Sequence, residues 1–224
     1  MMIEEQQVYY VQAGNEPQFR SRGVIHAILF LCSIIYISPI LNVVKTNTQF
    51  YSTIAFFMTN TMCFCVSAMY NIIHHQSVQS KQLMEWVQVL LIFPTCGCMF
   101  LPAIIEIDAF LASLCVVITG IIMILYSVVL INHSSRVVNA LIAISFIICT
   151  AISAPLIARN TTQTGRVFLY FEIGCYTISG IIFASKWPNL CTFVDYYELF
   201  HLFTVFGFIC AYFVNYITIR ALKV

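Results

Sequence analysis

Long apolar runs separated by short polar stretches dominate the chain, and each run has the length of a membrane crossing. A helix needs about 20 predominantly apolar residues to cross the hydrocarbon core of a bilayer. Seven segments meet this requirement: 23–44, 51–73, 86–105, 109–131, 137–158, 167–185 and 199–219. The pattern therefore predicts an all-α membrane protein, built as a bundle of seven transmembrane helices.

The polar stretches between these runs are too short to hold a second domain. Residues 1–22 contain three Glu and two Arg and no apolar core, so they predict a short polar tail and not a cleavable signal peptide. We expect residues 23–224 to form a single transmembrane domain, whose first hydrophobic helix directs the chain to the membrane.

Composition supports the same class of protein. Only 8% of the residues are charged and 61% are hydrophobic, whereas a soluble domain has about 25% charged residues. The net charge of +1 provides no basic surface for nucleic acid. Nine of the ten cysteines lie inside apolar runs, where cysteine acts as a small hydrophobic residue. A soluble enzyme, a disordered chain, a nucleic-acid-binding protein and a disulfide scaffold are therefore excluded.

Polar side chains gather at the end of the predicted bundle that carries the N-terminus. These residues are His26, Ser67, Asn71, His74, His75, Glu85, Gln88, Tyr196, Tyr197, Glu198 and His201. Polar groups inside a membrane are costly, so a cluster of them indicates a functional site. The alternative is structural, because Tyr and His also favour the membrane interface and Asn, Gln and Ser also bond between helices.

The order and spacing of these residues resemble the hemolysin III / progestin and adipoQ receptor family. The segment Ser67–Asn71 resembles its Ser-x-x-x-His motif, and Gln88 falls where the family has an Asp. The segment Met99–Pro102 resembles its aromatic-x-Pro motif, and Tyr197–Phe203 resembles its His-Glu-x-x-His motif. His26 matches a His of its first-helix motif. The length is similar to that of the monocyte-to-macrophage differentiation factor branch.

The resemblance implies a zinc ion held by three His, with a Ser and an Asp beside a bound water, and hydrolysis of a lipid amide such as ceramide. This sequence departs from that pattern. Asn71 and Tyr197 stand at two of the three ligand positions, His201 remains at the third, Gln88 replaces the Asp, and Ser67 is kept. We therefore expect a degenerate zinc site and no bound cofactor. The expected protein is a non-catalytic, receptor-like or lipid-binding member whose partner is a membrane lipid or a steroid.

Two other functions remain open. The first is a zinc-dependent lipid amidohydrolase with relocated ligands, which would come from the remaining candidate donors: His26, His74, His75, Glu85 and Glu198. The second is a channel or transporter, suggested by Glu172 in the sixth segment. The simpler expectation for Glu172 is an interfacial residue that pairs with Arg166 or Arg159.

Charge does not settle the orientation in the membrane, because each predicted face carries five Lys and Arg residues. The resemblance implies a cytoplasmic N-terminus. Asn160, in an Asn-x-Thr sequon, would then be extracellular or lumenal and a candidate for glycosylation, whereas the sequon at Asn132 would be cytoplasmic. Gly174, Ser179 and Gly180 are small residues that predict close helix contacts.

Overall fold

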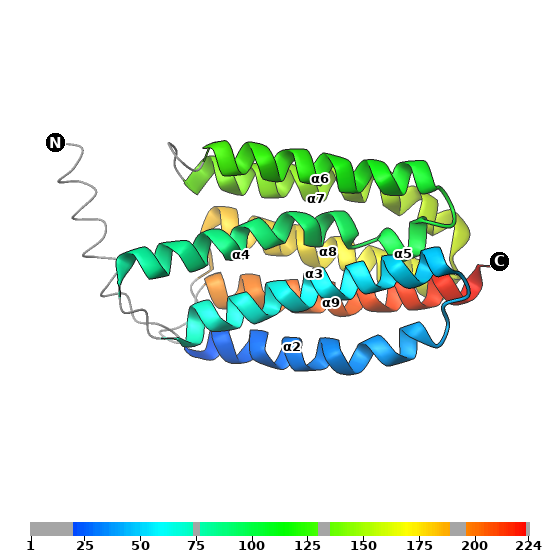
Figure 1. Cartoon of the computed structure of the whole chain (residues 1–224), viewed down its shortest axis with the longest axis horizontal. Coiled ribbons are helices and arrows are strands. Elements are labelled where there is room, and N and C mark those ends of the chain that lie inside the picture. The colour runs from blue at the N-terminus through cyan, green and yellow to red at the C-terminus, as the bar shows by residue number, and fades with distance from the viewer. Residues whose placement is uncertain (1–19, 74–76, 130–134, 189–195, 223–224) are drawn as a thin grey trace.

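Helices account for almost all of the chain that can be described. The computed structural model describes residues 20–73, 77–129, 135–188 and 196–222, and these ranges contain no strand. The helices are α2 (Arg20–Leu41), α3 (Asn47–Ile72), α4 (Val78–Cys98), α5 (Leu101–Ile104), α6 (Ala109–Val129), α7 (Ser135–Asn160), α8 (Gln163–Ser185) and α9 (Tyr196–Ala221). The long helices lie side by side along one axis (Figure 1). The prediction of an all-α bundle is confirmed for these parts of the chain.

Most of these helices are long and apolar enough to cross a membrane. Six candidate spans are present in the described ranges, and α7 contributes a shorter apolar segment, Ile144–Asn160. The third span runs from Gln79 through α4 and α5 to Ile104. The protein is thus a multi-pass helical membrane protein.

Several helices begin earlier than the apolar pattern predicts, because a polar residue caps each start. Ser77 accepts a hydrogen bond from the Ser80 amide, so α4 begins at Val78 and not at residue 86. Thr162 accepts one from the Gly165 amide, so α8 begins at Gln163 and not at residue 167. Such caps satisfy amides that lack a partner within the helix. A hydropathy pattern does not register them, because the capping residues are polar.

The third span is broken between α4 and α5. Pro102 has no amide hydrogen, which removes a bond of the helical ladder at this point. Asn215 of α9 bridges the break, because its Oδ1 accepts from the Ala103 amide at 3.1 Å and its Nδ2 donates to the Met99 carbonyl at 2.8 Å. Asn215 is 0% exposed. The break is therefore clamped to α9 by one side chain.

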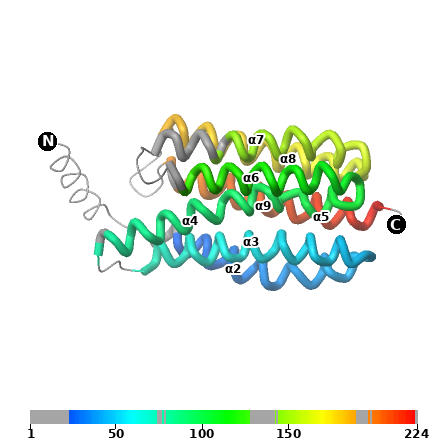
Figure 2. The backbone as a smooth tube through the Cα atoms, turned by 45° about the horizontal axis from the view of Figure 1, so that its top comes forward, coloured from blue at the N-terminus to red at the C-terminus, as the bar shows by residue number. Residues whose placement is uncertain are grey.

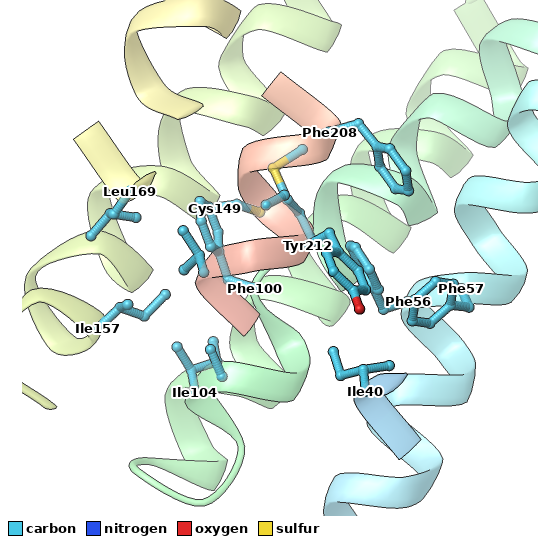
Figure 3. Packing of buried hydrophobic residues seen from close by; sticks show 14 of the residues in the cluster. Ile40, Phe56, Phe57, Phe100, Ile104, Cys149, Ile157, Leu169, Phe208 and Tyr212 are labelled. Carbon is cyan, nitrogen blue, oxygen red and sulfur yellow. The ribbon is translucent and has the colours of Figure 1, made fainter. Parts of the chain in front are cut away.

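Helices α8 and α9 pack closely along their length, as do α2 and α3. Figure 2 shows both pairs running along the bundle. The core between them is apolar and aromatic. Phe56 and Phe208 stack with ring centroids 5.9 Å apart, and Ile40, Tyr212 and Leu169 complete this part of the core (Figure 3).

The small residues of α8 do not all serve the close contact that the sequence predicts. Ser179 is 2% exposed and faces α9. A Cβ atom added at Gly174 or Gly180 would meet nothing within 4 Å, so these glycines leave open space and are not contact positions. The close approach comes instead from Gly207 of α9, where a Cβ atom would lie 2.8 Å from the Tyr176 ring.

Candidate functional site

Two histidines from distant parts of the sequence meet inside the bundle. His26 lies near the start of α2 and His201 lies near the start of α9. The distance from His26 Nε2 to His201 Nδ1 is 2.8 Å, and the rings meet edge to face with centroids 4.6 Å apart. The two side chains are 5% and 3% exposed. A hydrogen bond thus joins the first and last described helices.

Aromatic rings enclose this histidine pair. The Phe64 ring lies 6.1 Å from the His26 ring, and the Phe200 ring lies 4.9 Å from the His201 ring. His26 Nδ1 is buried and has no hydrogen-bond partner in the described structure. The pair is therefore largely shielded from water.

A second group of polar side chains joins α3 to α4 at the same end of the bundle. Gln88 Nε2 donates to Ser67 Oγ at 3.1 Å. Asn71 Nδ2 donates to the Ser67 carbonyl, one turn earlier on α3, at 2.7 Å. Ser67 is 2% exposed, whereas Asn71 and Gln88 are partly exposed. The amide side chains thus act as hydrogen-bond donors to the serine.

The remaining candidate residues differ in how deeply they are buried and in whether the structure describes them. Glu198 is 9% exposed and lies one turn before His201 on α9, and Glu85 is exposed on α4. His74, His75 and the side chain of Tyr197 lie outside what the structure describes. Asn160 is exposed at the end of α7. Of the predicted site residues, the structure brings His26 to His201 and Gln88 to Ser67.

The sequence interpretation expected Glu172 to lie at the membrane interface. The structure places it inside the bundle instead. Its side chain is 0% exposed, and neither carboxylate oxygen has a hydrogen-bond partner among the described residues. Arg159 and Arg166 are both exposed, so they do not provide the expected ion pairs. The early start of α8 explains the difference, because it places Glu172 more than two turns inside the helix.

Sequence reasoning missed Asn215 and the hydroxyl pair of Ser179 and Thr204. The Ser179 and Thr204 hydroxyl oxygens are 2.9 Å apart and join α8 to α9. An Asn in the middle of the apolar run 205–219 was a usable signal, since an amide at that depth needs partners. The hydroxyls gave no such signal, because Ser and Thr also bond within their own helix.

The comparison with protein families identifies the class. The family model for haemolysin-III related proteins matches residues 15–212. The chain belongs to the haemolysin-III related family. The match covers most of the chain and includes every residue of the candidate site. Comparison with curated proteins and with solved structures gave no match.

The side chains at the positions that the sequence resemblance assigns to zinc ligands do not form a good donor set for zinc. Zinc in proteins is held by Cys, His, Asp or Glu. Asn71 offers an amide, and the His201 ring uses Nδ1 in its bond with His26. Within the described ranges, no three His, Cys, Asp or Glu side chains come together in a metal-binding arrangement. We therefore derive no reaction step through zinc.

Proposed function

We propose that this haemolysin-III related protein crosses the membrane seven times and acts as a non-catalytic, receptor-like or lipid-binding protein. Its ligand is a membrane lipid or a steroid that enters the bundle near the candidate site. In this proposal the metal of the family site has been lost and the helical scaffold has been retained.

The hydrogen bond from Gln88 to Ser67 supports this proposal most directly. Hydrolysis needs a group that can take up a proton from water, and an amide does not titrate in that way. Gln88 here donates its hydrogen to the serine, which is the opposite role from that of a general base. The residue that would activate water is thus a structural link between α3 and α4.

The histidine pair supports the same conclusion. The bond between His26 and His201 holds α2 against α9 without an ion. Together the two polar groups connect four helices at one end of the bundle. Neutral hydrogen bonds between helices are sufficient to do this in a membrane.

Metal analysis and a hydrolysis assay test the proposal. The purified protein should carry zinc well below one equivalent and should not hydrolyse ceramide. The triple variant Asn71→His, Gln88→Asp, Tyr197→His should gain stoichiometric zinc, because it restores the residues that the resemblance implies. Asn60→His is the matched control, since Asn60 is also an Asn on α3 but is buried and lies away from the site. Stoichiometric zinc in the unmodified protein would contradict the proposal.

Ligand binding is a separate arm of the same test. A photoactivatable ceramide or sterol should label the purified protein, and the matching unlabelled lipid should compete with it. Labelling that no excess of either lipid reduces would count against a lipid ligand.

A relocated metal site is the second candidate, and the meeting of His26 with His201 favours it. Glu198, one turn from His201, is the nearest acidic residue along α9. If the unmodified protein carries zinc, His26→Ala should abolish the binding in this alternative. Loss of zinc in that variant together with ceramide hydrolysis in the unmodified protein would establish it.

A further inference from the structure

Glu172 occupies a position on the inward face of α8 that is otherwise apolar or small. The buried residues of this helix are Gly165, Leu169, Glu172, Ser179 and Ile182, which recur at the three-and-four spacing of one helix face. Glu172 lies nine residues after Gln163, so it is about 13 Å from the start of the helix. The helix has 23 residues and is about 34 Å long. An acidic side chain is thus buried deep within the bundle.

Among the described residues, neither carboxylate oxygen of Glu172 has a hydrogen-bond partner, and Arg159 and Arg166 are exposed. On its own helix Glu172 lies within electrostatic range of Tyr176 and Cys175, and on α9 it lies within range of Cys210. Cys96 of α4 and Cys63 of α3 also lie within electrostatic range of Tyr176.

Helix α7, which also packs against α8, has no acidic or basic residue between 142 and 158 and has Cys149 as its titratable group there. An ionised carboxylate with neither a counterion nor a hydrogen bond is strongly disfavoured in such surroundings. A bound proton removes that charge.

Hydroxyl-bearing residues form a line along α8 and α9 between Glu172 and the candidate site, and no hydrogen bond joins Glu172 to this line among the described residues. Tyr176 is one turn from Glu172 on α8, and Ser179 is nearly one further turn along the same face. The Ser179 and Thr204 hydroxyl oxygens are 2.9 Å apart. Thr204 lies three residues after His201 on α9, so the line reaches to within one turn of the histidine pair. Each of these hydroxyls can both donate and accept a hydrogen bond.

In the opposite direction along α8, the next buried residue after Glu172 is apolar. Leu169 lies one turn from Glu172 toward the start of α8 and is 0% exposed. Ile157, Ile219 and Val214 are also 0% exposed, and Ile104 is 1% exposed. Figure 3 shows Leu169, Ile157 and Ile104 in the same part of the core. On this side Leu169 stands between Glu172 and Gly165, beside which Thr161 and Thr218 form a buried hydroxyl pair at 3.0 Å.

We propose that Glu172 is a proton-binding site inside the bundle, reached from the end that carries the candidate site through Thr204, Ser179 and Tyr176. A proton from water at that end forms an O–H bond with a carboxylate oxygen of Glu172, and the negative charge disappears. On release this O–H bond breaks and the proton returns to water by the same hydroxyls. No electrons are transferred, and no other reactant is consumed.

Infrared spectroscopy of the full-length protein in lipid nanodiscs tests the bound proton. A protonated carboxyl group gives a C=O band that carboxylates lack and that shifts when deuterium replaces the proton. The unmodified protein at neutral pH should show such a band, and Glu172→Gln should lose it. If Glu172→Gln leaves the spectrum in this region unchanged, Glu172 is ionised and the proposal is wrong.

The rate of the deuterium shift tests the route. Tyr176→Phe removes one hydroxyl of the line and keeps the ring that packs on Gly207, so it should slow the shift severalfold. Tyr126→Phe is the matched control, because Tyr126 is 1% exposed but lies on α6, away from the line. Its rate should equal that of the unmodified protein.

A comparison of two double variants distinguishes loss of the route from local unfolding. Ser179→Ala with Thr204→Val removes the bonded hydroxyls of the line. Ser33→Ala with Thr61→Val removes another hydroxyl pair, also 2.9 Å apart, that joins α2 to α3. Only the first pair should slow the shift. Equal rates in all variants, or equal slowing in both pairs, would overturn the proposed route.

Discussion

Buried polar side chains in this bundle differ in how completely their hydrogen bonds are satisfied. Asn215 uses both ends of its amide on backbone groups of another segment. Glu172 has no partner for either oxygen, and Gln49 Nε2 and Thr53 Oγ1 are likewise buried without one in the described structure. A buried polar atom without a partner costs about 1–3 kcal/mol. Buried residues whose hydrogen bonds are complete thus stabilise the fold. Buried residues that lack hydrogen-bond partners lower its stability, so a requirement other than stability accounts for their presence.

Asn215→Leu should destabilise the protein markedly. The change keeps the size of the side chain but leaves the Met99 carbonyl without this partner, at a cost of about 1–3 kcal/mol, whereas the Ala103 amide keeps its bond to the Phe100 carbonyl at 3.0 Å. Thermal unfolding of the purified protein in detergent measures the effect.

Asn60→Leu is the control for this substitution. Asn60 is 3% exposed, but its amide donates only to the Phe56 carbonyl of its own helix. We expect a much smaller fall in the unfolding temperature for this variant. Equal falls for the two variants would show that the bridge across the helix break contributes nothing of its own.

Individual site residues could be predicted from the sequence where a polar residue stood at the spacing of a family motif. Gln88 and Ser67 were paired by their spacing relative to a family motif, and the structure brings them into contact. The bond between His26 and His201 could not be predicted, because it depends on how α2 and α9 pack. Glu172 was misplaced because its depth depends on where α8 begins.

At the scale of helices, the contact between α8 and α9 depends on a single glycine, which has no side chain to keep the helices apart. Gly207 lets the Tyr176 ring lie against the α9 backbone, and a Cβ atom there would meet the ring at 2.8–3.0 Å. An aromatic ring cannot move aside as a flexible chain end does. The two helices would have to separate, and the packing of the whole pair would be disturbed.

Gly207→Ala should therefore lower the unfolding temperature by an amount that corresponds to about 1–3 kcal/mol of overpacking. Gly174→Ala on the neighbouring helix is the matched control, because open space surrounds that position. It should be neutral or slightly stabilising, since alanine favours a helix by about 1 kcal/mol over glycine. A similar loss in both variants would argue against the close contact as the cause.

Helix existence was easier to predict than helix boundaries. A run of 20 apolar residues is a large signal, so every predicted segment corresponds to a helix in the structure. The boundaries depend on single capping residues such as Ser77 and Thr162. The division of the third span depends on Pro102 and on a partner more than 100 residues away, which no local pattern contains.

For the whole molecule, the seven crossings that we propose would place the start of α2 and the end of α9 on opposite sides of the membrane. The start of α2 and the end of α9 lie at opposite ends of the bundle in Figure 1. The surface that faces lipid is apolar, with many exposed Ile, Leu, Val and Phe side chains.

We expect the N-terminus to be cytoplasmic and Asn160 to be on the other side. If the enzyme that attaches glycans can reach Asn160, glycosidase treatment should shift the electrophoretic mobility of the protein, and Asn160→Gln should remove the shift. Epitope tags at the two ends should be accessible from opposite sides of sealed vesicles. A glycan that depends on Asn132 would reverse the orientation, and tags accessible from the same side would contradict seven crossings.

The break between α4 and α5 also affects how motion travels through the molecule. A continuous helix passes a rotation at one end to the other, whereas a broken helix does not do so through its backbone ladder. Here α5 is bonded to α9 through Asn215, while α4 carries Gln88 at the other end of the same span. The two parts of the third span are thus fastened to different helices, α5 to α9 and α4 to α3. Because the helical ladder is interrupted between α4 and α5, one continuous helix does not link the two attachments.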